Sequence, residues 1–213
     1  FMTSYGCPYN PLRGDTMVNT IYGPISIKEL HEKGADKFPV YTYNFEEDRV
    51  EISDAVEINS YGVRDLVRVE FDDGTHIDCE PSHQFWTFKI GSKKGQSYSE
   101  EKAVEAKDLV EGQRVRAIKF GLSGKKGNQY LEVLWKRRSR EKVHRLVMEY
   151  KLGRRLKKNE SGHHIDHDRL NNHPDNLTVV PGIAEHAFLH RKPGSNLRAP
   201  GEDNPTQICA CGC

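Results

Sequence analysis

Apolar and polar residues alternate over short stretches in the first half of the chain, and this pattern is typical of half-buried strands. The alternating runs cover residues 16–21, 40–43, 50–52, 55–60, 67–71 and 77–79. The last two runs flank Asp72-Asp73-Gly74-Thr75, and an Asp-Gly pair in such a place predicts a tight hairpin. Helical turns are expected at 27–32 and 103–109, and a further strand at 113–118. The first half is therefore predicted to be a mostly-β, turn-rich domain.

The pattern changes in the second half of the chain. Residues 121–128 (Gly-Leu-Ser-Gly-Lys-Lys-Gly-Asn) lack periodicity and predict a linker. A strand is expected at 130–135, and apolar residues spaced three and four apart within 140–150 predict a helix. Two short strands and a helix are expected between positions 163 and 190. Residues 193–205, rich in Pro, Gly and Asn, predict a loop.

Length and charge narrow the class of protein. A chain of 213 residues suits one large domain or two small ones. No apolar run is long enough to span a bilayer, and no signal segment opens the chain, so we expect a cytoplasmic or other intracellular protein. Residues 1–120 have a net charge of −6, whereas residues 121–213 have 17 Lys and Arg against 10 Asp and Glu, a net +7. The second half is therefore expected to meet an anionic partner, the alternative being a solvated basic face.

The five cysteines do not form a disulfide framework, because their number is odd and three crowd the end of the chain. Cys79 is expected to be a buried strand thiol. Cys209, Cys211 and Cys213 match one half of a zinc-binding pattern, and three cysteines are fewer than the four ligands of a structural zinc site. The chain begins with Phe1 and stops inside this cysteine pattern, which is expected of a fragment.

The most informative stretch is Ser161-Gly-His-His-Ile-Asp-His-Asp-Arg-Leu-Asn-Asn-His-Pro-Asp-Asn-Leu177. Six of the ten histidines lie between positions 163 and 190. Hydrolysis of a phosphodiester near neutral pH needs a base to activate water and a cation to neutralise the phosphate. Imidazole can serve as either base or metal ligand. Adjacent strand residues point to opposite faces, so a His-His pair can divide these two duties.

Four segments together resemble the HNH endonucleases of the phage and intron-homing type, which have a ββα-metal fold. They are Val143–Val147, His163–Asp166, Asn171–Leu177 and Glu185–His190. The resemblance implies an endonuclease that hydrolyses DNA phosphodiester bonds with one divalent metal ion. Mg²⁺ is the expected ion, while Mn²⁺, Zn²⁺ and Ni²⁺ stay open because imidazole ligands suit several metals.

The resemblance also implies residue roles. His164 matches the general base, His163 the first metal ligand and Asn176 the middle Asn that fixes the loop and orients the base. His186 matches the closing metal ligand, but one extra residue separates it from Asn176, so His190, one helical turn later, is the alternative.

Neighbouring polar residues are expected to have structural roles. Asp166 and Asp168 are expected to cap the turn rather than bind metal, and Asn171 and Asn172 to form the turn. Four further residues complete this set: we expect His144 and Arg145 to brace the fold, and His167 and His173 to be solvated.

Two basic clusters, at 135–140 and 151–158, accompany the histidines. Contacts of this kind bind phosphates without reading sequence. Because the resemblance implies double-stranded DNA as partner, the expected DNA-binding residues are Lys136, Arg137, Arg138, Arg140, Arg154 and Arg155. Plain solvent exposure is the alternative for each.

A second resemblance covers residues 7–120 and is to the Hint fold of inteins and Hedgehog autoprocessing domains. It rests on ordered short motifs: Gly14–Val18, Ile27–Leu30, Pro39–Tyr43, Gly74–Phe85 and Ala106–Val115. The family opens with a nucleophilic Cys and carries a Thr-x-x-His motif, whose histidine His83 matches.

Two positions depart from the Hint pattern. Glu80 stands where Thr is expected, and Pro11 where the opening Cys is expected, with Cys7 about four residues early. Splicing chemistry is therefore expected to be lost or incomplete, which leaves Cys7 and His83 as a Hint remnant.

Taken together, the sequence predicts an α+β chain. We expect a Hint-like β domain (7–120), a linker (121–129), an HNH endonuclease domain (130–192) and a Cys-rich tail (193–213). The predicted function is a metal-dependent DNA endonuclease of the homing or mobile-element type. The alternatives are an intein-like autoprocessing protein that carries an HNH domain, and a non-catalytic DNA-binding relic.

Overall fold

The computed structural model describes residues 11–34, 37–56, 58–93, 96–136 and 139–182, together with 186, 187 and 189. The chain divides into two compact units, residues 1–143 and 144–213, and each is described by itself. Several predicted residues lie outside the described part: Cys7, Arg137, Arg138, His190 and the three C-terminal cysteines. Within the described part, no helix is long and apolar enough to cross a lipid bilayer.

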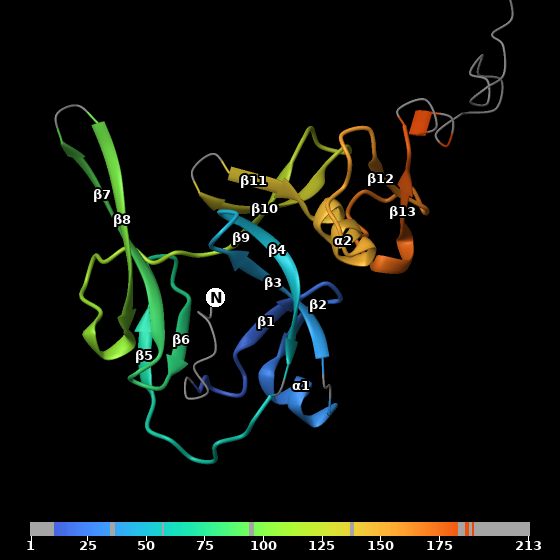
Figure 1. The fold of residues 1–213 in the computed structure, drawn as a ribbon. Helices are drawn as coiled ribbons and strands as arrows, with labels where there is room; N and C mark the ends of the chain where they lie inside the picture. Colours follow the sequence, from blue (N-terminus) through green and yellow to red (C-terminus); the bar gives the residue numbers. More distant parts are fainter. Residues whose placement is uncertain are drawn as a thin grey trace, which may run out of the picture. The chain divides into compact units, whose positions relative to one another are not determined.

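The first unit begins with an antiparallel sheet in the order β2-β1-β3-β4 (Figure 1). Its strands are β1 (Met17–Thr20), β2 (Gly23–Ser26), β3 (Lys37–Asn44) and β4 (Arg49–Val56). Helix α1 (Ile27–Glu32) follows β2 directly, because the Ser26 hydroxyl accepts a hydrogen bond from the Glu29 N–H at 3.2 Å and caps the helix. The predicted helix at 27–32 is therefore confirmed.

Two hairpins follow, formed by β5 (Val67–Glu70) with β6 (His76–Cys79) and by β7 (Gln84–Lys93) with β8 (Gln96–Glu105). The predicted Asp-Gly hairpin is confirmed between β5 and β6, where Gly74 has a φ of 81°. Ile77, Cys79, Phe85 and Ala106 form a buried cluster that these hairpins share with the short helix η1 (Ala106–Asp108).

A three-stranded sheet has the order β11-β10-β9. Its strands are β9 (Lys119–Ser123), β10 (Tyr130–Lys136) and β11 (Ser139–Lys142). Ser123 pairs with Tyr130, so the segment expected to be a linker is the end of β9 and a hairpin turn. Gly124 has a φ of 101°, and a Cβ there would lie 2.6 Å from the Asn128 carbonyl oxygen. Gly124 thus lies in a hairpin turn rather than in a linker. The two compact units divide after residue 143.

Two further sequence predictions in this unit are wrong. Residues 103–105 belong to β8 and only 106–108 are helical, in a single 3₁₀ turn. Of the strand expected at 113–118, only Val115 pairs, in an isolated bridge to Thr87. Both segments are too short for periodicity to separate strand from helix.

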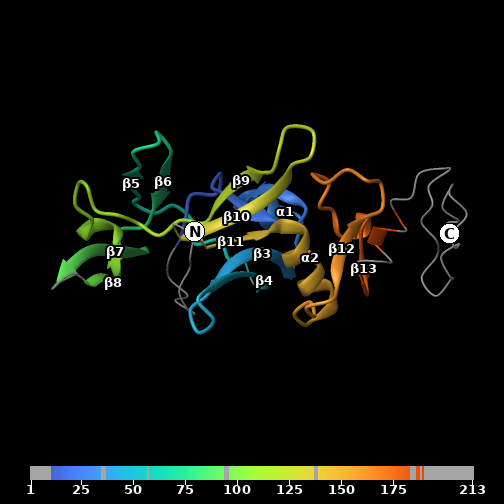
Figure 2. The same cartoon turned by 90° about the horizontal axis from the view of Figure 1, so that it is seen from above.

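The second unit packs a helix against a hairpin. Helix α2 (Val143–Leu152) buries Leu146, Val147 and Met148 and ends at Gly153, whose φ is 62°. The hairpin pairs β12 (Ser161–His164) with β13 (Leu177–Val180), and the short helix η2 (Pro174–Asn176) precedes β13. Figures 1 and 2 both show α2 beside β12. The chain is α+β, as predicted.

Candidate functional site

The β12–β13 hairpin positions the two adjacent histidines. His163 pairs with Thr178 and His164 with Leu177, so the histidines are the last two residues of β12. Each is only 5% exposed. Because successive strand residues point to opposite faces, the two rings have different neighbours.

The His164 ring is held by an amide. Its Nε2 lies 3.2 Å from Oδ1 of Asn172, while the Asn172 amide nitrogen donates to the Leu170 carbonyl at 3.0 Å and so fixes which way the amide faces. A carboxamide oxygen only accepts, so Nε2 carries the proton and Nδ1 is the basic nitrogen. On α2, the His144 ring packs edge-on against His164 with centroids 5.1 Å apart.

The His163 ring contacts two other imidazoles. The His186 ring lies edge-on with centroids 5.4 Å apart, and the His167 ring with centroids 5.3 Å apart. His186 is helical, and its Nδ1 lies 3.3 Å from the Ser161 hydroxyl on β12. The structure thus brings together the two residues expected to be metal ligands, His163 and His186.

These two imidazoles fit a single divalent ion. With N–metal distances of ~2 Å, two rings on one ion hold their centres roughly 5 Å apart, close to the 5.4 Å between His163 and His186. Among the residues described, no three His, Cys, Asp or Glu side chains already form a metal-binding group. Imidazole suits Zn²⁺ and Ni²⁺ better than Mg²⁺ and Mn²⁺, which prefer oxygen ligands.

Electrostatics favour the neutral form of His186. Burial lowers its pKa from 6.5, and electrostatic interactions with Arg169 and His164 lower it further. The neutral imidazole is the form that binds a cation. The positive charge of Arg169 would also attract a phosphate.

The loop between β12 and β13 is tied together by Asn176. Its Oδ1 accepts from the Asp166 N–H at 3.0 Å, and its amide nitrogen donates to the Asp166 carboxylate and the Asn171 carbonyl, each at 2.8 Å. The Asn171 and Asn176 amides lower the pKa of Asp166. Asp166 therefore caps the turn, as expected, and Asn176 fixes the loop that follows His164.

The sequence predicted different roles for two residues of the site. Asn172 was expected to form the turn, but its side chain also bonds His164. His167 was expected to be solvated, and it is exposed, yet its ring contacts His163 and its φ is 63°. The double Asn before Pro174 was the only signal for Asn172, and nothing in the sequence distinguishes His167 from His173.

The expected DNA-binding residues of the second unit differ in their surroundings. Arg154 makes a bidentate ion pair with Glu160, at 2.7 and 2.9 Å, and so braces the turn after α2. Arg155 is exposed. The Arg154 guanidinium lowers the pKa of Glu160 to about 2.

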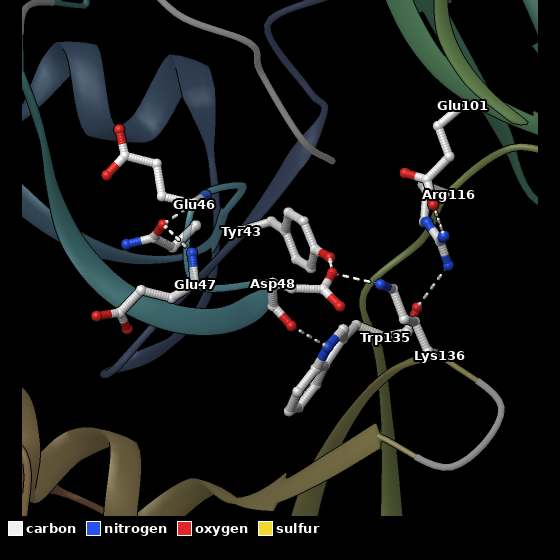
Figure 3. A network of polar contacts seen from close by, with 9 residues as sticks. Tyr43, Glu46, Glu47, Asp48, Glu101, Arg116, Trp135 and Lys136 are labelled. Atoms are coloured by element: carbon white, nitrogen blue, oxygen red, sulfur yellow. Dashed lines mark hydrogen bonds and ion pairs between the residues drawn. The ribbon is translucent and has the colours of Figure 1, made fainter. Parts of the chain in front are cut away.

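In the first unit, Lys136 at the end of β10 forms an ion pair with Asp48 of the β3–β4 turn (Figure 3). The neighbouring Trp135 indole donates to the Asp48 carbonyl at 3.2 Å, and the Tyr43 hydroxyl donates to the Asp48 carboxylate. Lys136 and Tyr43 lower the pKa of Asp48. Arg140 on β11 is 55% exposed and 3.8 Å from Glu132, so its charge is less neutralised than that of Lys136.

The Hint-like motif lies in a turn beside the start of the described chain. The Glu80 N–H donates to the Pro11 carbonyl at 3.0 Å, and Leu12 forms a bridge with Cys79. His83 is 2% exposed and packs edge-on against Phe85 with centroids 5.2 Å apart. Cys79 is fully buried, and burial raises its pKa to about 11, so it is the buried strand thiol that we expected.

Comparison with known families gives one match. Residues 141–183 match the model of the HNH endonucleases. This range, about a fifth of the chain, contains His144, His163, His164, Asn172 and Asn176 and ends before His186. No curated protein matches the chain.

The match marks the chain as an enzyme of the nuclease class, which hydrolyses phosphodiester bonds. HNH endonucleases act on DNA, which supports a nucleic-acid partner, and they generally use a divalent metal.

Proposed function

We propose that the second unit carries the catalytic centre of a metal-dependent DNA endonuclease, with His164 as general base and His163 and His186 as metal ligands. One observation carries this proposal. The Asn172 carboxamide holds His164 at 3.2 Å in the tautomer whose Nδ1 is basic, while the neighbouring His163 turns to a second imidazole on the other side of β12.

The residues of the chain would then divide the reaction as follows. His164 Nδ1 takes a proton from a water molecule, whose oxygen attacks phosphorus while the bond to the leaving oxygen breaks. Asn172 keeps the ring oriented and stabilises the imidazolium through the same hydrogen bond. A divalent cation held by His163 and His186 would supply positive charge to the scissile phosphate and the leaving oxygen. Asn176 holds the loop that carries Asn172.

The substrate is proposed to be double-stranded DNA, held by basic residues that precede and follow helix α2 in the sequence. Arg140 and Arg155 are exposed, and phosphate contacts of this type give affinity without sequence preference. Lys136 and Arg154 are already ion-paired, so we assign them smaller parts. Arg137 and Arg138 are proposed, from the sequence, to bind DNA as well. His190 stays the alternative metal ligand. The proposed site of action is intracellular.

A role in a homing or mobile genetic element, of phage type, is proposed from the sequence pairing of an HNH segment with a Hint-like one. We propose that residues 7–120, within the first unit, form a Hint-like scaffold. Support comes from a hydrogen bond of 3.0 Å from the Glu80 N–H to the carbonyl of Pro11, the residue that stands where the nucleophilic Cys is expected. This bond holds Pro11 beside the turn that leads to His83. Proline has no nucleophilic side chain, so we expect no self-cleavage and no change from Cys7→Ala.

Cleavage of a supercoiled plasmid tests the endonuclease proposal. The purified chain is incubated with EDTA or with Mn²⁺, Mg²⁺, Ni²⁺ or Zn²⁺, and nicked and linear products are counted. Metal-dependent cutting that His164→Ala and His163→Ala both abolish supports the assigned roles. DNA binding without cutting under every metal would favour the non-catalytic alternative.

A further inference from the structure

The turn after the histidine pair holds a residue in an unusual backbone conformation. His167 has a φ of 63°, and Asp48 is the other non-glycine residue with a positive φ in the part of the chain that the structure describes. This left-handed region favours glycine, because a Cβ crowds the backbone there. The His167 N–H donates to the His164 carbonyl at 3.1 Å and closes the turn.

This turn returns the His167 side chain to the buried His163. The two ring centroids are 5.3 Å apart, nearly the same as the 5.4 Å between His163 and His186. His163 therefore contacts two imidazoles, one from the loop and one from the following helical segment. His167 is exposed, whereas His163 is 5% exposed, so the loop imidazole faces both solvent and the proposed ligand.

We propose that His167 is a third imidazole ligand of the divalent-metal centre, beside His163 and His186. The inference rests on the proposed function, in which those two residues hold the ion. Catalytic metal sites commonly have three protein ligands and leave the remaining positions to water or substrate. His163 and His186 supply two, and His167 is the further imidazole that the described structure places against His163.

Binding requires a movement of the His167 side chain. Among the described residues no three ligand groups already surround one point, so the His167 ring has to turn toward the ion. An exposed side chain on a loop can do so without repacking a core. The turn alone would favour glycine at this position. Metal binding by the imidazole would explain why a histidine stands there despite its positive φ.

His167→Gly separates a ligand from a merely structural residue. Glycine fits the positive φ, so the melting temperature of the metal-free variant is expected to equal or exceed that of the wild type. Its affinity for Co²⁺ and Ni²⁺, measured by calorimetry, is expected to fall by at least about tenfold. Co²⁺-shifted imidazole N–H signals in the proton NMR spectrum are expected to lose one member. His173→Asn, which changes an exposed histidine of the same loop, is the matched control.

The variants also distinguish failure of this proposal from failure of the proposed function. If His163→Ala abolishes metal binding while His167→Gly binds like the wild type, His167 is no ligand and the proposed function stands. If His190→Ala removes the imidazole signal instead, His190 is the third ligand and the proposal is overturned. If His163→Ala still binds like the wild type, the ligand assignment of the proposed function fails as well.

Discussion

The Asn172 carboxamide determines which nitrogen of the His164 ring carries the proton, since its oxygen lies 3.2 Å from Nε2 and can only accept a hydrogen bond. Asn172→Ala is therefore expected to slow DNA cleavage roughly 10–100-fold, because the ring loses its orientation. Asn172→Asp keeps an acceptor oxygen on a side chain of the same length, so it is expected to hold the ring and to lose less activity than Asn172→Ala.

Cleavage rates at saturating metal check this prediction. The rate of Asn172→Asp should fall between those of the wild type and Asn172→Ala. An exposed amide, Asn159, provides the control through Asn159→Ala. If Asn172→Ala cleaves DNA as fast as the wild type, the hydrogen bond does not position the base.

Gly162 is expected to be intolerant of a methyl group. A Cβ at this position would lie 3.0 Å from Cδ2 of His144 and 3.5 Å from Cγ of Met148. Because the His144 ring packs against His164 at 5.1 Å, Gly162→Ala should displace both rings. We expect a loss of about 1–3 kcal/mol in the free energy of unfolding, and slower cleavage under conditions where the variant is folded.

Urea unfolding and cleavage assays of Gly162→Ala test this, with Asp175→Ala, whose side chain is 91% exposed, as the control. Equal stability and activity in Gly162→Ala and the wild type would show that His144 does not press on the hairpin.

The ion pair of Glu160 with Arg154 is expected to make stability depend on pH. The pKa of Glu160 is about 2 in the folded chain against 4.5 ordinarily, so the unfolded chain binds more protons between these values. The contribution of this carboxylate is therefore complete above pH 4.5 and is lost as the pH falls toward 2. Melting temperatures of the wild type and Glu160→Gln should converge over this interval.

Asp175, whose side chain is 91% exposed, supplies the control through Asp175→Asn. A difference between Glu160→Gln and the wild type that stays constant from pH 6 to pH 2.5 would argue against the pair as its source.

Lys136 and Arg140 are expected to contribute unequally to DNA binding. The Asp48 carboxylate already neutralises Lys136, whereas Arg140 is 55% exposed and 3.8 Å from Glu132. Arg140→Ala should reduce the slope of log K against log salt by about 0.9, and Lys136→Ala by less. Asp48→Asn should tighten binding. Fluorescence anisotropy between 50 and 300 mM salt measures these slopes, and equal losses for both variants would refute the difference.

Local sequence rules predicted much of the fold. Helix α1, the Asp-Gly hairpin and the apolar face of α2 all follow from capping, turn chemistry and periodicity within a few residues. The 121–129 segment did not, because a Gly-rich stretch fits a hairpin turn as well as a linker, and only the pairing of Ser123 with Tyr130 separates the two.

The candidate site was predictable where a motif marked it. His163, His164 and Asn176 come from one continuous stretch, and the structure places them in one hairpin and its loop. The bond from His164 to Asn172 and the contact of His163 with His167 depend on where the loop folds back. Neither follows from residue type, since Asn172 and His167 have ordinary turn-forming neighbours.

The most direct test of the account is plasmid cleavage by the wild type and His164→Ala with EDTA and with added Mn²⁺ or Mg²⁺. We expect cutting by the wild type only when metal is present, and a loss of roughly 10²–10⁴-fold in His164→Ala, with both proteins equally folded and equally able to bind metal. Equal cutting by the two proteins, or cutting by the wild type in EDTA, would contradict a metal-dependent reaction with His164 as its base.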